Sequence, residues 1–369
     1  MSLVLYRKYR PQTFSDIIGQ EHVVQTLTNA ISAGMISHAY LFSGPRGSGK
    51  TTLARLLAKA ANCENRKEGQ FEPCNKCASC TEITDNRSMD LIEIDAASHR
   101  GIDEIRELKE GIKFSPVKSK YKVFIIDESH QLTKEAANAL LKTLEEPPSH
   151  AIFILATTEI HKMIATIISR CQRFDFRRLT VPEIIKRLEI LCGKEKVKIE
   201  RTALELIAIN AAGAIRDAES LLDQALTFAG NLNRELKTED IKNILGLVEV
   251  ELISNFCEFL FQKKALETVN YLNDLVDKGF DLQEFSKALM NYLRHGLILK
   301  ITGETAANQI ITGLTKEEFE KLKKQTVNLK EADLHKVIDL FLEAGNKIKY
   351  SPIPQLPLEL AIIDFCGVV

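Results

Sequence analysis

A short glycine-rich segment constrains the fold of this chain more than any other feature. Residues 44–51, GPRGSGKT, match the pattern G-x-x-x-x-G-K-[ST] of a phosphate-binding loop. An apolar run at residues 39–42 precedes the loop and predicts a strand. Apolar residues then recur at the spacing of one buried helix face: Leu53, Leu56, Leu57 and Ala60. This order of strand, loop and helix is the context that such a loop requires, and it argues against a chance match in a glycine-rich turn.

The residues of this loop have separate tasks in a nucleotide site. Glycines let the backbone turn its N–H groups toward phosphate oxygens, and the dipole of the following helix adds to the positive field. Lys50 can reach the terminal phosphates, and the hydroxyl of Thr51 can bind Mg²⁺. We expect the nucleotide to contact these residues: Gly44, Pro45, Arg46, Gly47, Ser48, Gly49, Lys50, Thr51 and Thr52.

Two adjacent carboxylates, Asp127 and Glu128, follow a second apolar run at residues 123–126. So short a run predicts a strand buried on both faces, as in a parallel sheet between helices, and ligands bind beyond the carboxyl ends of such strands. Asp127 would hold Mg²⁺ directly or through water, and Glu128 would polarise the water that attacks the γ-phosphate. Alone, such a pair is also common at solvated strand ends. Together with the loop it predicts nucleotide hydrolysis.

Composition indicates a globular protein of two or three domains. The chain has 369 residues, of which 45% are hydrophobic and 27% are charged. No apolar run approaches the length that spans a bilayer, so no membrane partner is expected. Charges from Arg7 onward argue against a secretory signal and favour a cytoplasmic location. Since the formal net charge is −1, DNA contacts must come from a local patch or from assembly.

Four of the eight cysteines are clustered with the spacing C-x10-C-x2-C-x2-C: Cys63, Cys74, Cys77 and Cys80. In a reducing cytosol this clustering favours a metal over disulfides. Four thiolates that leave no ligand position vacant fit a structural zinc site. We therefore predict a zinc-stapled insertion at residues 63–80, which we call the cysteine module. A redox switch and unligated surface thiols are the alternatives.

The predicted elements divide the chain into an α/β part and a helical part. Further strands are predicted at residues 90–94, 151–155 and 172–176, which completes a sheet of about five strands, and helices at 101–112 and 136–144. Beyond residue 179 the pattern predicts helices only, with apolar faces that suit packing or a subunit interface. We expect domains at residues 1–178, 179–242 and 243–369.

Several short segments coincide with one known family. They are YRPQTF at residues 9–14, GQ at 19–20, the phosphate-binding loop, the four cysteines, LLKTLEEPP at 140–148, SRC at 169–171 and RD at 216–217. Over nearly its whole length the chain closely resembles the gamma/tau subunits of the bacterial DNA polymerase III clamp loader, which are AAA+ ATPases. The resemblance implies an α/β P-loop AAA+ domain with a parallel five-stranded sheet and a zinc insertion, then an all-α lid domain and an all-α collar domain. The chain ends where the family's collar would end, so we expect the helicase- and polymerase-binding extension of the longer form to be missing.

The resemblance also assigns roles to residues outside the loop. Arg170 looks like the arginine finger that enters the ATP site of a neighbouring subunit. Thr158, with Thr157 as the alternative, looks like sensor 1, and Arg216 looks like sensor 2 on the lid. Without the family each of the two arginines is an ordinary surface residue. Lys142 corresponds to a position that faces the template backbone, with an ordinary exposed lysine as the alternative.

The same resemblance implies an adenine pocket near the amino terminus. Tyr9, Pro11, Ile17 and Ile18 would line it, and core packing is the competing interpretation. After the acidic pair, this chain has polar residues where the family usually has apolar ones: Ser129 and Gln131. The departure leaves the acidic pair itself unchanged.

By resemblance the chain is an ATP-driven motor subunit with ATP, Mg²⁺ and Zn²⁺ as cofactors. Several copies would assemble with the delta and delta-prime subunits into a five-membered ring that opens the sliding clamp, called beta, and places it on primed-template DNA. Adaptor subunits would link the complex to single-stranded-DNA-binding protein, in the replisome at the bacterial nucleoid.

Two other classes of protein share parts of this pattern. A non-hydrolysing structural subunit like delta-prime shares the cysteine module and the finger, but Lys50, Thr51, Asp127 and Glu128 are intact here. A branch-migration motor or a protein unfoldase is expected to lack the four-cysteine insertion and the collar.

Overall fold

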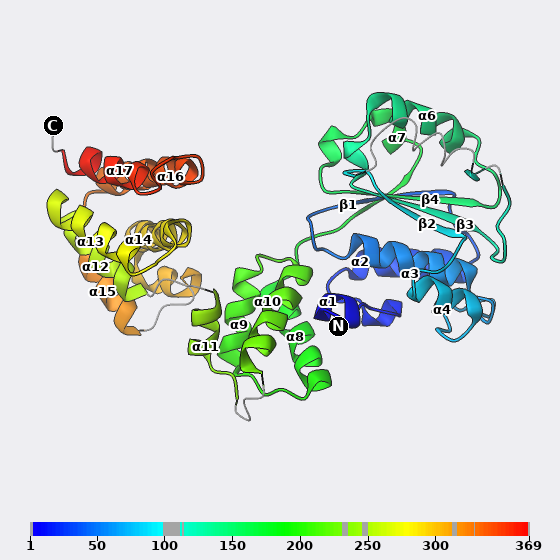
Figure 1. Ribbon diagram of the computed structural model, residues 1–369, viewed down its shortest axis with the longest axis horizontal. Helices are drawn as coiled ribbons and strands as arrows, with labels where there is room; N and C mark the ends of the chain where they lie inside the picture. The colour runs from blue at the N-terminus through cyan, green and yellow to red at the C-terminus, as the bar shows by residue number, and fades with distance from the viewer. Residues whose placement is uncertain are drawn as a thin grey trace. The chain divides into compact units, whose positions relative to one another are not determined.

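The chain divides into two compact units, Met1–Thr238 and Glu239–Val369. They are seen in a computed structural model that describes residues 3–98, 111–112, 114–230, 235–245, 250–311, 316–327 and 329–367 (Figure 1). The division lies near the start of helix α11 (Thr238–Leu245). The domain boundaries expected from the sequence, after residues 178 and 242, stay predictions.

A parallel sheet of five strands forms the centre of the first unit (Figure 1). The strands are β1 (Ala39–Ser43), β2 (Leu91–Asp95), β3 (Lys122–Asp127), β4 (Ala151–Thr157) and β5 (Gln172–Asp175), in the spatial order β2-β3-β4-β1-β5. Every neighbouring pair is parallel. The predicted five-stranded parallel sheet is thus confirmed. Because all neighbouring strands are parallel, the carboxyl ends of β1, β3 and β4 share one edge of the sheet.

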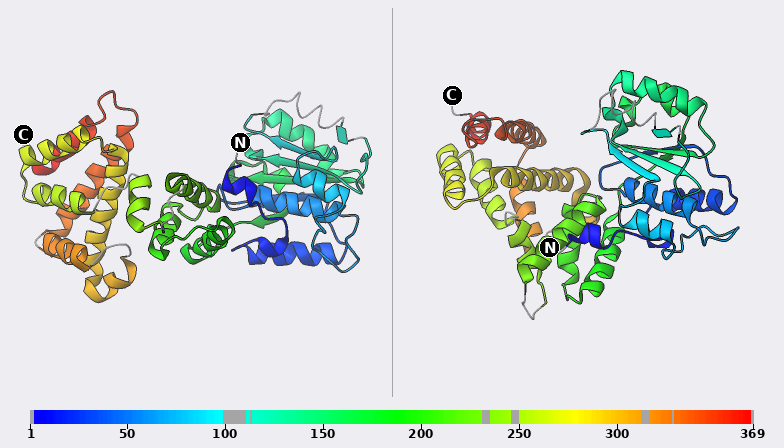
Figure 2. Two further views of the ribbon diagram at one scale, coloured as in Figure 1. Left: turned by 60° about the horizontal axis from the view of Figure 1, so that its bottom comes forward. Right: turned by 45° about the vertical axis from the view of Figure 1, so that its right-hand side comes forward.

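Helices cover both faces of the sheet (Figures 1 and 2). On one face lie α2 (Glu21–Ser32) and α3 (Lys50–Asn62), and on the other lie α6 (Lys134–Glu145) and α7 (Ala165–Ile168). Alternate strand residues supply the two cores, since side chains of a strand point to opposite faces. Phe42 packs in the core with α2 and α3, whereas Phe124 and Phe153 stack at 5.2 Å in the core with α6 and α7.

The helix after the phosphate-binding loop is buried as its sequence predicts. The four predicted residues are at most 1% exposed: Leu53, Leu56, Leu57 and Ala60. Two short elements of the amino-terminal segment, α1 (Leu5–Lys8) and the 3-10 turn η1 (Phe14–Asp16), precede the sheet. The cysteine module ends in α4 (Ala78–Thr84), which packs on α3.

The first unit ends with three helices that we call the lid helices. They are α8 (Val181–Glu195), α9 (Arg201–Asn210) and α10 (Ile215–Ala229). Apolar residues of all three are buried, among them Leu188, Ile207 and Leu222. Gly213 precedes α10 with φ +85°, where a Cβ would clash with the side chain of Arg178. The break between α9 and α10 at this glycine therefore has a steric as well as a conformational cause.

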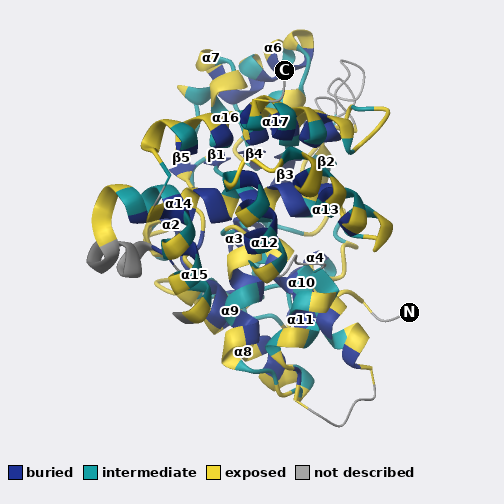
Figure 3. Cartoon of the chain, turned by 90° about the vertical axis from the view of Figure 1, so that its left-hand side faces the viewer, coloured by how far each residue is buried: buried dark blue, intermediate teal, exposed yellow. Residues whose placement is uncertain are grey.

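The second unit is helical over its described residues. After α11 its helices are α12 (Val250–Phe261), α13 (Ala265–Asp277), α14 (Leu282–Ile310), α15 (Lys316–Val327), α16 (Glu331–Ile348) and α17 (Leu356–Cys366). Phe256 lies at the core, with its ring 5.1 Å from Phe285 and 5.9 Å from Phe341. Buried residues of α12 to α17 join in one core, and Figure 3 shows buried and exposed residues alternating along the described helices.

Two expectations from the sequence can be compared with the structure only over its described residues. Of the helix predicted at residues 101–112, only residues 111 and 112 lie within the described part of the chain. Beyond residue 179 the described segments contain one extended pairing, an isolated bridge between Ile199 and Leu236. Among the described helices, none has the length and apolarity needed to cross a membrane.

The chain passes from the sheet to the lid helices through a polar joint. Glu183 closes a capping box with Thr180 at the start of α8, and its carboxylate also accepts hydrogen bonds from Arg177 at 2.6 and 2.9 Å. The Arg177 guanidinium holds the pKa of Glu183 at about 2, with help from the N–H of Thr180 and against partial burial. The side-chain amide of Gln20 donates a hydrogen bond to the carbonyl of Arg177 at 2.8 Å, and its oxygen accepts one from the N–H of Arg177 at 3.2 Å. These bonds give the GQ segment a structural role.

We expect Glu183→Gln to lower the free energy of unfolding at neutral pH, because the charged acceptor of this joint is lost. The pKa of Glu183 falls from 4.5 to about 2 on folding, so its ionised form stabilises the fold fully above 4.5. That stabilisation is lost as pH falls toward 2, and the difference between wild type and variant should shrink with it.

Urea denaturation at a series of pH values measures this difference. Glu331→Gln is a control: like Glu183, Glu331 lies in the first turn of a helix, but it is exposed and its carboxylate makes no ion pair within the described residues. If the free energies of unfolding of wild type and Glu183→Gln differ by the same amount at every pH, the ionised carboxylate of Glu183 does not stabilise the fold as proposed.

Candidate nucleotide-binding site

A cavity of about 260 Å³ lies in the first unit where the two predicted motifs meet. Its walls come from the phosphate-binding loop, the acidic pair, the amino-terminal segment and α10. The predicted site residues that line it are Pro11, Ile17, Ile18, Arg46, Gly47, Ser48, Gly49, Lys50, Thr51, Thr52, Asp127, Glu128 and Arg216. Five predicted residues are not among its lining residues: Tyr9, Gly44, Pro45, Thr158 and Arg170.

Glycine is required where the phosphate-binding loop leaves β1 and enters α3. At Gly44 a Cβ would clash with the carbonyl of Phe176, and Gly49 has φ +97° at the N-cap of α3. The ammonium of Lys50 donates 2.8 Å hydrogen bonds to the carbonyls of Gly44 and Pro45. Burial lowers the pKa of Lys50, and the acidic pair opposes that shift. The loop thus holds a nearly buried cation beside the N–H groups that open α3.

The two predicted magnesium ligands are in direct contact. The hydroxyl of Thr51, in the first turn of α3, donates a 2.8 Å hydrogen bond to Oδ2 of Asp127 at the end of β3. Hydroxyl and carboxylate oxygens are ligands that Mg²⁺ prefers. The donor set therefore fits a magnesium ion at the wall of the cavity.

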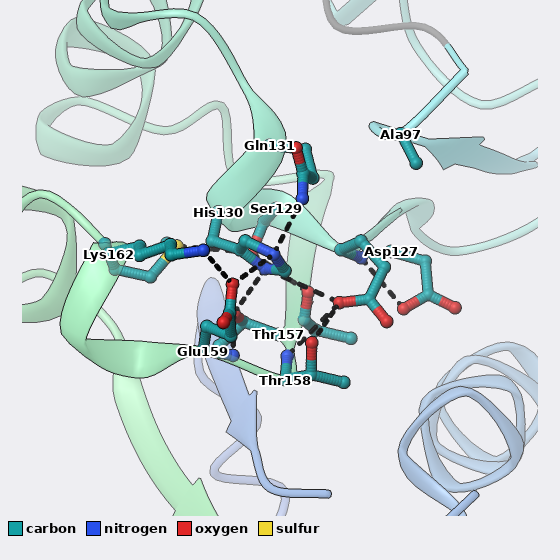
Figure 4. A network of polar contacts seen from close by, with 12 residues as sticks. Ala97, Asp127, Ser129, His130, Gln131, Thr157, Thr158, Glu159 and Lys162 are labelled. Atoms are coloured by element: carbon teal, nitrogen blue, oxygen red, sulfur yellow. Dashed lines mark hydrogen bonds and ion pairs between the residues drawn. The ribbon is translucent and has the colours of Figure 1, made fainter. Parts of the chain in front are cut away.

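Glu128 is held in a defined orientation at the edge of the sheet. Its backbone has φ +46°, and its N–H donates to the carboxylate of Asp127 at 2.9 Å. Oε2 of Glu128 accepts hydrogen bonds from the hydroxyl of Thr158 at 2.8 Å and from its N–H at 3.2 Å (Figure 4). Thr158 thus contacts the acidic pair and does not reach the cavity itself.

A histidine that was not predicted from the sequence, His130, belongs to this network. The side chain of His130 is 4% exposed, and its Nδ1 lies 3.0 Å from the hydroxyl of Thr157 and 3.5 Å from Glu128. Its Nε2 lies 3.2 Å from the carboxylate of Glu159 (Figure 4). The signal was a histidine two residues after the acidic pair, in the sequence DESH.

The two polar residues that depart from the family pattern belong to the same network. Ser129 is buried and donates a 3.0 Å hydrogen bond to the carbonyl of Ala156 on β4. The side-chain amide of Gln131 lies 3.1 Å from Nε2 of His130 (Figure 4). Both residues therefore have polar partners beside the acidic pair.

Three of the four residues expected around adenine line the cavity, and the fourth, Tyr9, does not. Tyr6 lines the cavity, and the guanidinium of Arg216 lies 4.7 Å from the centre of its ring. Hydrogen bonding to Arg216 lowers the pKa of Tyr6. The ring of Tyr9 lies near Lys8 and Lys194, and its carbonyl accepts a 2.6 Å hydrogen bond from Arg187. Tyr6, and not Tyr9, is the tyrosine of this cavity.

Arg170 follows α7, and its guanidinium contacts residues of its own chain. Its Nη2 lies 2.5 Å from the carboxylate of Glu145 at the end of α6, and its Nη1 donates to the carbonyl of Thr166 at 2.8 Å. The side chain is 32% exposed. Two adjacent elements therefore hold the guanidinium at the surface of the first unit.

The four clustered cysteines form a compact set of sulfur ligands. Their Sγ atoms all lie within 4.8 Å of one another, and those of Cys74 and Cys80 are 4.0 Å apart. A tetrahedron with Zn–S bonds of about 2.3 Å needs sulfurs about 3.8 Å apart. Burial opposes ionisation of Cys74, but the N–H groups of Lys76 and Cys77 lower its pKa to about 6. The cluster is compatible with zinc.

Comparison with known proteins agrees with this geometry. Residues 19–180 match the family model "DNA polymerase III, delta subunit", residues 183–231 match "DNA polymerase III clamp loader subunit, ATPase lid domain", and residues 236–369 match "DNA polymerase III subunits gamma and tau domain III". The chain is 36% identical to the DNA polymerase III subunit gamma of Buchnera aphidicola subsp. Acyrthosiphon pisum, with 98% of this chain and 97% of that protein covered. The chain belongs to the DNA polymerase III gamma/tau family.

The gamma/tau family includes longer proteins. The chain is 44% identical to the subunit tau of Bacillus subtilis, with 98% of this chain and 63% of that protein covered. For the subunit tau of Escherichia coli the identity is 35% and the covered shares are 98% and 54%. The chain thus spans more than half but less than two thirds of the length of these relatives.

A solved structure shares the fold over about two thirds of this chain. The RuvB Holliday junction branch migration motor of Thermotoga maritima matches with a TM-score of 0.50 at 20% identity, over 68% of this chain and 78% of that one. Together the matches show a gamma/tau subunit with the fold of the AAA+ clamp-loader ATPases, so the family predicted from the sequence is confirmed.

Proposed function

We propose that this gamma/tau subunit binds and hydrolyses ATP to drive loading of a sliding clamp. The single observation that carries the proposal is the contact between Thr51 and Asp127 at 2.8 Å, which joins the phosphate-binding loop to the acidic pair in one cavity. ATP phosphates would replace the carbonyls of Gly44 and Pro45 as hydrogen-bond acceptors of Lys50. A Mg²⁺ ion bound by Thr51 and Asp127 would neutralise phosphate charge. The base would lie against Tyr6 and the apolar residues Pro11, Ile17 and Ile18.

In this proposal Glu128 accepts a proton from the water that attacks the γ-phosphate. Thr158 supports that role because it already fixes one carboxylate oxygen of Glu128 at 2.8 Å. Arg216 lines the same cavity from α10, so phosphate contact by its guanidinium would link nucleotide state to the lid helices. These roles for Thr158 and Arg216 are those of sensor 1 and sensor 2.

Arg170 would act on the nucleotide of a neighbouring subunit. Its position at the surface, outside the cavity of its own chain, supports this role. In a neighbour's site the guanidinium would stabilise charge that develops on the transferred phosphoryl group. The guanidinium would then leave the carboxylate of Glu145, which it contacts at 2.5 Å, and bind the phosphate in the neighbour's site.

The assembly that we propose follows from the family. Several copies join delta and delta-prime subunits in a five-membered ring, and ATP binding lets the ring open the clamp. Primed-template DNA then enters, where Lys142, exposed on α6, would contact template phosphates, and hydrolysis releases the closed clamp. Adaptors to single-stranded-DNA-binding protein complete the complex, in the cytoplasm at the nucleoid. ATP energy is used to switch affinities for clamp and DNA.

A non-hydrolysing structural subunit is the alternative that shares most features. Such a subunit needs the arginine finger and the cysteine module but not an intact hydrolytic site. Here Lys50, Thr51, Asp127 and Glu128 all line the cavity, which favours the hydrolysing subunit. We also propose that the cysteine module holds a structural zinc ion.

We expect Lys50→Ala to weaken nucleotide binding by about 100-fold or more, because the buried cation of the loop is lost. The dissociation constant of a fluorescent ATP analogue, measured with the isolated chain, checks this. Lys287→Ala, an exposed lysine on α14, is the control and should bind as wild type. Equal affinities for wild type and Lys50→Ala would refute binding at this loop.

Arg170→Ala should leave nucleotide affinity unchanged and depress hydrolysis by the assembled complex about 10³-fold, because the finger acts only in the transition state. Arg173→Ala removes a nearby exposed arginine of β5 and should hydrolyse as wild type. Mixing Arg170→Ala and Lys50→Ala subunits should restore part of the activity, since a Lys50→Ala subunit supplies a finger to its neighbour. Undiminished hydrolysis by an assembly of Arg170→Ala subunits would show that the finger is assigned to the wrong residue.

The purified chain should contain about one zinc ion, which metal analysis and Co²⁺ substitution can measure. Cys77→Ser removes a ligand from the cluster and should lower the zinc content. Cys192→Ser, at a buried cysteine of α8 outside the cluster, should retain the metal. Wild-type chain that binds neither zinc nor cobalt would contradict the metal assignment.

A further inference from the structure

The cysteine module makes a specific contact with the amino-terminal segment. Glu72 lies two residues before Cys74. Its carboxylate accepts hydrogen bonds from the N–H of Phe14 at 2.8 Å and from the N–H and hydroxyl of Ser15 at 2.9 and 2.8 Å. The rings of Phe71 and Phe14 meet edge to face at 6.4 Å. One carboxylate of the module thus satisfies three donors of a segment that lies 57 and 58 positions away in the sequence.

Gln12 is held from the same side. The side chain of Asn75, between Cys74 and Cys77, donates to the carbonyl of Gln12 at 3.1 Å. Lys59 of α3 donates to Oε1 of Gln12 at 2.7 Å. Both groups of this one residue, backbone and side chain, are therefore fixed by the region around the cysteines.

Lys59 connects the cysteine cluster to this contact. Its side chain is 2% exposed, so its charge needs a nearby partner. Burial lowers the pKa of Lys59, and all four cysteines, as thiolates, act in the opposite direction. Zn²⁺ with four thiolates carries a net charge of about −2. A metal-loaded cluster would thus supply counter-charge for the ammonium that holds Gln12.

The segment held in this way leads into the nucleotide cavity on both sides. Pro11 precedes Gln12 and lines the cavity, and the residues that follow Ser15 also line it: Asp16, Ile17 and Ile18. The held residues therefore lie, in sequence, between two stretches of the cavity wall. Displacement of residues 12–15 would move the wall where the base is proposed to bind.

We propose that the cysteine module is a positioning element of the nucleotide site, in which Glu72, Asn75 and Lys59 hold residues 12–15 and thereby fix the apolar wall of the cavity. The inference rests on the proposed function, because it concerns the site where ATP is proposed to bind. Metal binding and nucleotide binding are then coupled, and coupling between two binding sites is reciprocal. Zinc strengthens nucleotide binding, and nucleotide slows the release of zinc.

Variants of the contact separate positioning from metal binding. Glu72→Ala removes the three hydrogen bonds to Phe14 and Ser15 and leaves all four cysteines in place. Asn75→Gly removes the bond to Gln12, and glycine suits the φ of +57° at that position. Glu68→Gln is the matched control, because Glu68 is an exposed acid of the same module without a hydrogen bond or ion pair in the described part of the chain.

The full chain is used for two measurements with a fluorescent ATP analogue and Mg²⁺. The first is the dissociation constant of the analogue, together with zinc content. We expect about tenfold weaker binding for Glu72→Ala and for Asn75→Gly, full zinc content in both, and wild-type behaviour for Glu68→Gln. The second is the rate of zinc release to a chromogenic chelator, which the analogue should slow in wild type and slow less in Glu72→Ala.

Unchanged analogue affinity in a folded, zinc-loaded Glu72→Ala chain would overturn the inference. If that variant does not fold, wild-type affinity of Asn75→Gly, or wild-type zinc release that the analogue does not slow, overturns it equally. A wild-type chain that fails to bind the analogue refutes the proposed function itself, and so the two failures are distinguishable.

Discussion

The hydrogen bond from Thr51 to Asp127 joins two parts of the chain that are 76 positions apart, and the candidate site depends on it. Thr51 belongs to the helix that follows β1, and Asp127 ends β3. The bond can form because parallel strands bring their carboxyl ends to one edge, where a change of strand order opens a crevice. The spatial order β2-β3-β4-β1-β5 thus places loop, acidic pair and Thr158 within reach of one another.

Local sequence predicted the elements of this edge well. The five strands lie within two residues of their predicted positions, because short apolar runs between polar turns allow few alternatives. The phosphate-binding loop and the four cysteines were also predictable, since each is a short pattern with a physical requirement for its spacing. Family resemblance supplied Arg170, Arg216 and Thr158, whose local sequence is ordinary.

Residues that act through long-range contacts were not predictable. Tyr6 enters the cavity because Arg216 of α10 stacks on its ring, and nothing in the first ten residues distinguishes it from Tyr9. The contacts of His130 come from the end of one other strand, β4, which ends at Thr157 and is followed by Glu159. The three hydrogen bonds that Glu72 accepts likewise depend on how the module folds over α3, a placement that hydrophobic periodicity does not encode.

We propose that this gamma/tau subunit hydrolyses ATP in response to the sliding clamp and DNA. The most direct test is steady-state ATP hydrolysis by the chain assembled with delta and delta-prime subunits, with and without sliding clamp and primed-template DNA. The account predicts strong stimulation when clamp and primed DNA are present together. If neither the clamp nor primed DNA changes the rate of hydrolysis, the chain is an ATPase with a different target. If no ATP is hydrolysed at all, the chain is a structural subunit and the proposal is wrong.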